Sequence, residues 1–208
     1  MGEGWSEKVP SIDYDWRGLS LKQPAASLVA DGWKPVENRN PTQVKHGTVA
    51  GRWVLVHASK GQTFPSRASI AASYPVPLPE PFLSPCSLPA GQVLAVARIR
   101  GVYKKSELSI DAEAWGNEGE ACILFDVMLK LNVPVAIPGS LGFWKLHLDP
   151  VRTSPARTTD RERAMSTTEL AAWRAVQDAK YAHKRAARCE CLRVVLQAIH
   201  DGSYSQPV

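Results

Sequence analysis

Long apolar runs are missing from this sequence of 208 residues. The longest ones, such as Trp53–Val56 and Val93–Ala97, have the length of a β-strand and fall short of the roughly 20 residues that a transmembrane helix needs. The first residues, Met1–Glu7, also lack the basic and apolar regions of a secretory signal peptide. We therefore expect a cytoplasmic protein without a membrane partner.

Cysteine is scarce as well, and the four cysteines are Cys86, Cys122, Cys189 and Cys191. The spacing of Cys189 and Cys191 is wrong for a zinc knuckle, and no second pair of ligands lies near them in the sequence. The chain also contains no Walker loop, GxSxG elbow, HExxH helix or dinucleotide-binding fingerprint. We expect four reduced thiols, no metal site and no cofactor.

Short alternating and β-branched stretches predict an α+β fold, built on a small β-barrel of about five or six strands. The expected strands are residues 18–22, 52–58, 91–102, 121–131 and 143–148. A first helix is expected between Pro24, which suits a first turn, and Gly32, which suits a left-handed stop. A second short helix is expected within Ser66–Ser73. The prolines of Pro75–Pro81 lock φ and lack an N–H donor, which predicts a loop.

The chain divides into three predicted parts. Residues 17–149 are expected to form the barrel domain, and residues 150–208 a basic helical extension. Residues 1–16 have no periodic pattern and are expected to form a flexible arm. Three aromatic residues of this arm could still dock on the barrel: Trp5, Tyr14 and Trp16.

The C-terminal extension contains one long predicted helix with a charged middle. Ser166–Glu169 is a capping box, and Gly202 follows the expected last residue, His200. The net charge of +5 and the pI near 9.1 favour polyanionic partners, because cations placed near phosphates release condensed counterions. Candidate nucleic-acid-binding residues in this helix are Lys180, Lys184, Arg185 and Arg188. The same residues fit a solvated helix face equally well.

One motif carries a family resemblance. Gly32–Arg39 contains the pattern G-x-K-x-x-E-x-R, which resembles the signature of the ASCH (activating signal cointegrator homology) family, a branch of the PUA-like barrels. Leu19–Leu28 is similar to the family's first strand and helix, although Ala25 stands where a large aromatic residue is common. Gly51–Lys60 resembles the second strand with its H-A-S-K-like turn, and 141–146 the closing strand. The resemblance implies a PUA-like barrel that binds nucleic acid.

The residues of this motif suggest how a ligand could bind. In an extended chain Glu37 and Arg39 lie on one face and Lys34 on the other, unless a turn at Pro35 intervenes. Glu37 and Arg39 would fix each other's rotamers and leave Lys34 as a movable cation at the mouth of a cleft. Such a cleft could hold a phosphate or an unstacked base. The alternative is an ordinary ion pair that ties the helix to the barrel.

Other residues could line the same cleft if the family layout holds. On the strands and at their ends these are Ser20, Lys22, Ser59, Lys60 and Lys145. Their alternative role is surface solubility. Trp115 lies in a polar stretch with little nearby to bury an indole, so it could stack on a base or cap the barrel.

We therefore expect a nucleic-acid-binding module whose cleft engages an end, a loop or a modified base of RNA or DNA, helped by the basic helix. An enzyme is the first alternative: a metal-free ribonuclease could use Lys34 as acid or base and Glu37 to orient it. Related amidohydrolases acting on acylated cytidine carry a threonine nucleophile at the position of Glu37, which a carboxylate cannot replace. A protein-interaction scaffold through the C-terminal helix is the second alternative. The five histidines are scattered and form no recognisable pair, so we expect them to have structural roles. They are His46, His57, His147, His183 and His200.

Overall fold

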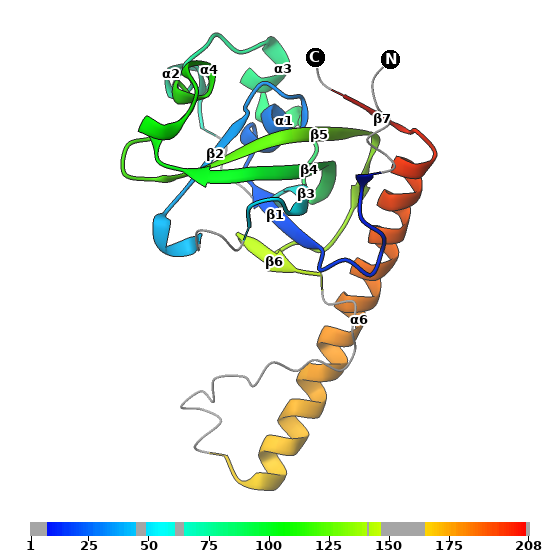
Figure 1. Ribbon diagram of the computed structural model, residues 1–208. Helices are drawn as coiled ribbons and strands as arrows, with labels where there is room; N and C mark the ends of the chain where they lie inside the picture. The colour runs from blue at the N-terminus through cyan, green and yellow to red at the C-terminus, as the bar shows by residue number, and fades with distance from the viewer. Residues whose placement is uncertain (1–7, 45–48, 61–64, 141, 147–164, 207–208) are drawn as a thin grey trace.

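The computed structural model describes residues 8–44, 49–60, 65–140, 142–146 and 165–206. Figure 1 shows a curled sheet with short helices around it and one long helix, α6, whose first half projects away from the sheet. The strand order is β2-β5-β4-β3-β1-β6, and β7 pairs with β5. The protein thus has the expected α+β architecture with a curled, barrel-like sheet.

The strands are short at the sheet edges and long in the middle: β1 Arg17–Leu21, β2 Val36–Arg39, β3 Trp53–Ala58, β4 Gln92–Tyr103, β5 Ala121–Ala136, β6 Phe143–Lys145 and β7 Tyr204–Ser205. All five predicted strands are confirmed, although only 143–146 of the last one lies within the described residues. β1 and β3 are parallel, and the other pairs are antiparallel. β5 continues beyond the predicted end at Leu131, because Val135 pairs again with Val93 after an irregularity that accommodates Pro134.

The helices are α1 Ala25–Ala30, α2 Arg67–Ser73, α3 Glu80–Leu83, α4 Ile110–Glu113 and α6 Thr167–His200, with 3-10 turns η2 Pro41–Gln43, η3 Pro85–Ser87 and η4 Lys105–Glu107. The predicted ends of α1 are confirmed, since Pro24 precedes it and Gly32 follows with φ 74°. The predicted loop Pro75–Pro81 is wrong at its end. Pro81 lies in the first turn of α3. A backbone N–H has no partner within the helix at that position, so the proline costs no hydrogen bond.

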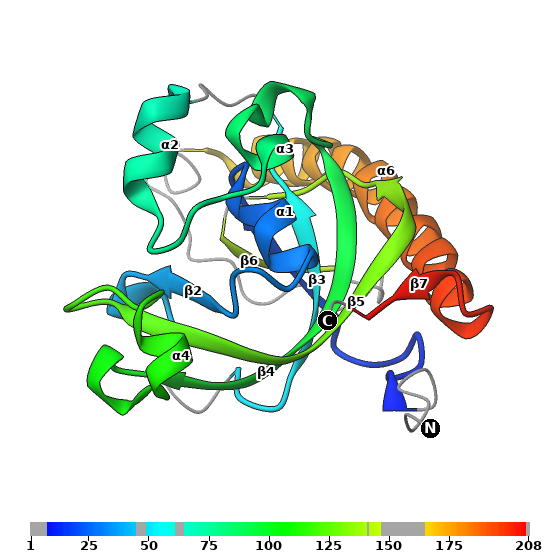
Figure 2. The same cartoon turned by 90° about the horizontal axis from the view of Figure 1, so that it is seen from above.

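Apolar side chains form three buried clusters. The first fills the concave side of the sheet, and the third lies under α2, α3 and α4. The second lies on the opposite side of β1 and β3, where Leu192, Val195 and Ile199 of α6 pack against the sheet. Figure 2 shows α2 and α4 on the side away from β7 and the C-terminal end of α6. α6 therefore belongs to the folded unit through its last three turns.

The described part of the N-terminal arm also packs on the sheet. Trp16 is buried, and its indole donates to the Ser11 carbonyl. The Tyr14 hydroxyl accepts a hydrogen bond from the Trp53 amide. Trp5 and the expected boundary at 149–150 lie outside the described residues.

All four cysteines are free thiols, as predicted. No helix in the described part of the chain is both long and apolar enough to cross a membrane.

Candidate ligand-binding site

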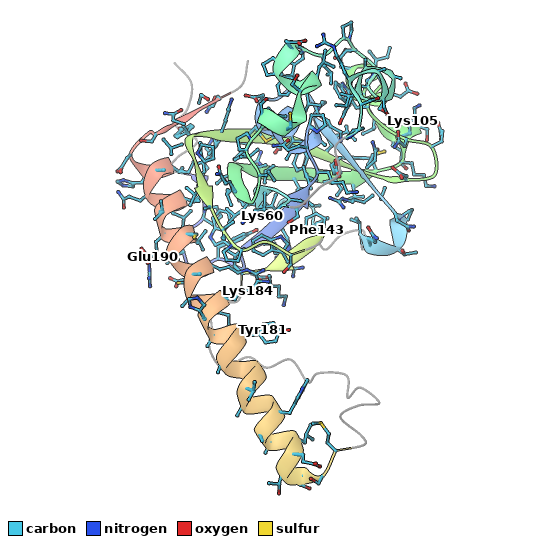
Figure 3. The ribbon with its side chains drawn as sticks, turned by 180° about the vertical axis from the view of Figure 1, so that it is seen from behind. Lys60, Lys105, Phe143, Tyr181, Lys184 and Glu190 are labelled. Carbon is cyan, nitrogen blue, oxygen red and sulfur yellow. The ribbon has the colours of Figure 1, made fainter. Side chains whose placement is uncertain are left out.

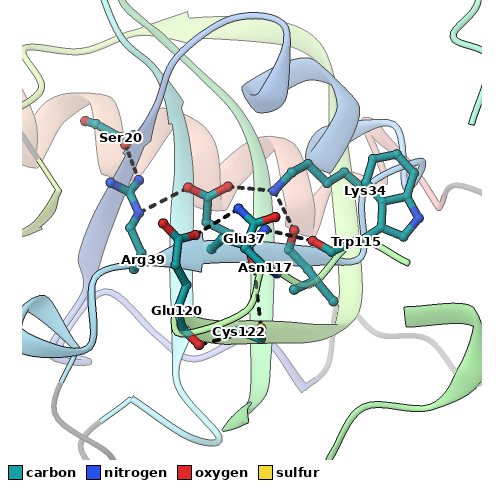
Figure 4. Close-up of polar contacts among 10 residues, drawn as sticks. Ser20, Lys34, Glu37, Arg39, Trp115, Asn117, Glu120 and Cys122 are labelled. Carbon is teal, nitrogen blue, oxygen red and sulfur yellow. Dashed lines mark hydrogen bonds and ion pairs between the residues drawn. The ribbon is translucent and has the colours of Figure 1, made fainter. Parts of the chain in front are cut away.

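The motif residues form a chain of charged contacts from one edge of the sheet toward the other (Figure 4). Lys34 Nζ donates to Glu37 Oε2 at 2.8 Å and to the Val36 carbonyl. Glu37 Oε1 lies 3.1 Å from Arg39 Nε, and Arg39 Nη2 donates to the Ser20 carbonyl at 2.9 Å. Since β2 ends the sheet on one side and β1 lies next to the other end, Arg39 bridges the open side of the curled sheet.

This network is largely buried. Lys34 is 7% exposed and Glu37 9% exposed. Lys34 precedes β2, and its ammonium reaches the Glu37 carboxylate from there, so the three charged groups meet, but not at the predicted open cleft. The predicted movable cation is wrong, because a buried ammonium needs an anion and acceptors close by, and Lys34 has both. The arrangement is an ion-pair network, as in the alternative interpretation, but it connects β2 with β1 instead of tying the helix to the barrel.

A cavity of about 610 Å³ lies on the other face of β1 and β3, next to α6. Side chains alternate along these strands: Leu19 and Val56 point into the concave core, whereas Ser20 and His57 point to the cavity. Ser20 and His57 are direct partners in the parallel β1–β3 pairing. The lining residues are Ser20, His57, Ser59, Lys60, Gly91, Ala136, Ile137, Pro138, Gly139 and Ser140. Three of the expected cleft residues, Ser20, Ser59 and Lys60, thus meet here, without Lys34 or Glu37.

Three side chains form a hydrogen-bonded row at the floor of this cavity. Trp144 Nε1 donates to Ser20 Oγ at 2.9 Å, and Ser20 Oγ lies 2.9 Å from His57 Nδ1. The indole can only donate, so the serine hydroxyl accepts a hydrogen bond from it. The Trp144 ring also meets the imidazole edge to face. His57 Nε2 is buried and has no hydrogen-bond partner among the described residues.

His57 is held in its neutral form. Burial lowers its pKa below the ordinary value of 6.5; the Ile137 carbonyl opposes this shift, and the nearby charge of Arg188 adds to it. The bond between Ser20 and His57 fits either tautomer of the imidazole, because a hydroxyl can donate one hydrogen bond and accept two. The cavity floor therefore contains a buried imidazole.

Arg188 of α6 holds the 138–140 segment that lines the cavity. Its guanidinium donates to the Pro138 carbonyl at 2.7 Å, to Ser140 Oγ at 2.8 Å and to the Lys145 carbonyl. It also lies over the Trp144 ring, 4.3 Å from the centroid. Arg188 is 6% exposed, so it positions the 138–140 loop instead of presenting the free phosphate contact expected from the sequence.

Two lysines lie at or near the cavity, Lys60 exposed and Lys184 half-buried. Lys60 lies in its lining, and Lys184 Nζ is 3.5 Å from Ser140 Oγ. Figure 3 shows Lys60, Phe143 and Lys184 on one side of the molecule, where α6 passes the sheet. The other predicted cations are not in the cavity lining: Lys22 and Lys145 are exposed, Arg185 is half-buried, and the side chain of Lys180 lies outside the described residues.

Trp115 is buried, so the expected base-stacking role is wrong. Its indole is 8% exposed and packs in the third cluster with Ile70 and Phe82, near the ring of Tyr74. Its carbonyl accepts a hydrogen bond from Asn38 Nδ2 at 2.7 Å. The sequence around Trp115 is polar, and the apolar partners come from α2 and α3, which are distant in the chain.

His57 is a site residue that the sequence did not identify. Its only signal was its place in the H-A-S-K-like turn, since no second histidine lies at a sequence spacing that indicates a functional pair. Of the others, His183 and His200 are exposed on α6, and His46 and His147 lie outside the described residues.

The function of this chain is inferred from its fold and its candidate site. No protein-family model matches the chain, and no curated protein matches it significantly. The chain is an α+β protein with a cavity on the outer face of a curled sheet. Its ligand is inferred below from the chemistry of that cavity.

Proposed function

We propose that this protein is a nucleic-acid-binding module and that the cavity over β1 and β3 holds one nucleotide of RNA or DNA. The observation that carries the proposal is the composition of the cavity, with polar groups on its floor and Lys60 and Lys184 at its rim. Its volume of about 610 Å³ lies within the roughly 300–1,000 Å³ of sites for small organic ligands. A nucleotide matches such a cavity, because it joins a planar base of this size to an anionic phosphate that can meet the lysines.

Charge and sequence resemblance support the same proposal. The net charge of +5 favours a polyanion, and exposed Lys22 and Lys145 would extend the contacts along a phosphate backbone. The resemblance of the chain to the ASCH family implies a PUA-like barrel with a nucleic-acid ligand, and we include this relationship in the proposal. In this arrangement the Lys34–Glu37–Arg39 network positions β1 from behind and does not touch the ligand.

The enzyme alternatives lose support from this geometry. A ribonuclease or amidohydrolase that used Lys34 and Glu37 would need both groups at a ligand. The two side chains are bonded to each other below the surface, and neither lines the cavity. We therefore propose binding alone.

A salt-dependent titration tests the proposal. Fluorescence anisotropy of labelled single-stranded RNA and DNA should show binding that weakens as salt rises. Lys60→Ala and Lys184→Ala should each weaken binding several-fold and flatten the log–log salt slope by about 0.7, the value for one phosphate contact on a single strand. Lys105→Ala is the control, since Lys105 lies on another part of the surface (Figure 3). Wild-type protein that binds neither nucleic acid, or cavity variants that bind like the control, would overturn the proposal.

A further inference from the structure

Tyr181 is an exposed aromatic residue near the cavity, at the point where α6 leaves the sheet (Figure 3). It is 53% exposed. Residues three and seven positions apart share one face of an α-helix, so Tyr181 lies on the same face as Lys184 and Arg188. Arg188 fixes the direction of this face, because its guanidinium contacts Ser140 and the Trp144 ring. Tyr181 therefore lies on the side of α6 that faces the sheet, one turn beyond the last residue that touches the cavity lining.

The helix around Tyr181 carries positive charge and no negative charge. Residues 180–189 include four Lys or Arg and no Asp or Glu. Lys184 and Arg185 thus have no carboxylate within one turn along α6. Burial and the charge of Arg188 lower the pKa of Lys184. Such a surface favours an anionic partner, because each cation placed near a phosphate releases condensed counterions.

Lys184 connects this part of α6 to the cavity. Its Nζ is 3.5 Å from Ser140 Oγ, and Ser140 lines the cavity. Tyr181 precedes Lys184 by one turn, or roughly 4.5 Å along the helix axis. If one nucleotide of a strand occupies the cavity and a phosphate next to it meets Lys184, the neighbouring base comes within reach of the Tyr181 ring.

We infer that Tyr181 stacks on a second base of a bound single strand, next to the nucleotide in the cavity. This inference rests on the proposed function and adds to it a second contact and the kind of strand that binds. A tyrosine ring can stack on any base, because every base has a π-face, and the nearby cations can hold the phosphates of the same strand. A base within a duplex is already stacked on its neighbours, so this contact selects single strands.

Two ligands of different length separate the stacking contact from the cavity. A uridine octanucleotide reaches both places, whereas uridine 5′-monophosphate fills the cavity alone. The affinity of the full chain for the labelled octanucleotide is measured by fluorescence anisotropy, and that for the mononucleotide by competition. Tyr181→Ala should weaken octanucleotide binding about tenfold, the effect of a stacking contact of roughly 1.4 kcal/mol, and leave mononucleotide binding unchanged.

Three further variants assign the effect to the ring. Tyr181→Phe keeps the ring and should bind the octanucleotide within about twofold of wild type. Val176→Ala is the matched control and should bind like wild type, because Val176 is 64% exposed and lies roughly 140° around the helix from Tyr181. Lys60→Ala should weaken both ligands, since Lys60 lines the cavity. The salt slope of Tyr181→Ala should equal that of wild type, because no charge is removed.

The outcomes distinguish this inference from the proposed function. If Tyr181→Ala bound the octanucleotide like wild type while Lys60→Ala weakened it, stacking would be overturned and the cavity retained, with the exposed ring left for a protein partner. An equal loss in Tyr181→Ala and Tyr181→Phe would assign the contact to the hydroxyl and also overturn stacking. Wild-type protein that bound neither ligand would overturn both proposals.

Discussion

At the scale of single residues, Glu37 holds two cations with one carboxylate. Its Oε2 accepts from Lys34 and its Oε1 pairs with Arg39, in a site where the Glu37 side chain is 11% exposed. Glu37→Gln removes the negative charge and leaves the buried ammonium of Lys34 without an anion. We expect the free energy of unfolding in urea to fall by about 3–5 kcal/mol, the usual cost of breaking a buried ion pair from one side.

An exposed pair provides the control for this substitution. Glu190 and Arg193 of α6 form an ion pair whose side chains are 68% and 62% exposed. Glu190→Gln should unfold at the same urea concentration as wild type, because solvent screens such pairs. If Glu37→Gln were equally silent, the motif would not fix β2 to the sheet.

Gly139 is the second residue whose role can be tested. An added Cβ would lie 2.2 Å from His57 Cε1, so either the 138–140 loop or the imidazole must move. We expect Gly139→Ala to weaken binding of single-stranded RNA several-fold in anisotropy while the salt slope stays near wild type, because the rim cations are untouched. Val133→Ala serves as the control, because the Val133 side chain is 76% exposed and lies outside the cavity lining. An unchanged affinity for Gly139→Ala would show that the loop does not shape the binding site.

At the scale of elements, local patterns predicted most of the structure. The capping box set the start of α6, where Ser166 Oγ accepts from the Glu169 amide and the Glu169 carboxylate accepts from the Ser166 amide. The end of β5 and the whole of β7 escaped prediction, because strand pairing depends on partners far away in the sequence. The short α3 escaped for another reason: prolines that exclude a helix interior are accepted in its first turn.

The two halves of α6 differ in burial. Leu192 is fully buried against the sheet, whereas Val176 in the projecting half is 64% exposed. We expect Leu192→Ala to lower the free energy of unfolding by about 2–5 kcal/mol, because it removes buried methyl groups and leaves a cavity. Val176→Ala should unfold in urea like wild type. Equal effects of the two substitutions would contradict the docking of α6 through its C-terminal half.

At the scale of the whole molecule, the candidate site is a product of long-range packing. The sequence identified Ser20, Ser59 and Lys60 as residues of one cleft, and they do meet. It did not identify His57 and Trp144 as their partners, which lie 37 and 124 positions from Ser20. It also could not show that Lys34 and Glu37 are buried, because burial depends on which elements close over a residue.

The neutral state of His57 links this site to the stability of the whole protein. Burial lowers the pKa of His57 in the folded protein, whereas in the unfolded chain it is near 6.5. As the pH falls through 6.5, the unfolded chain gains a proton that the folded protein does not bind. The free energy of unfolding therefore decreases with falling pH, down to the lower pKa of the folded state, and is fully regained above 6.5.

Urea unfolding of wild type and His57→Gln across this pH range measures that link. Every other titrating group is common to both proteins, so their contributions cancel in the difference between the two stability curves. We expect wild type to lose more stability than His57→Gln between about pH 7 and pH 5, because only wild type carries the buried imidazole. Parallel curves would mean that His57 binds protons equally in both states. The imidazole would then be open to water instead of buried at the floor of the cavity.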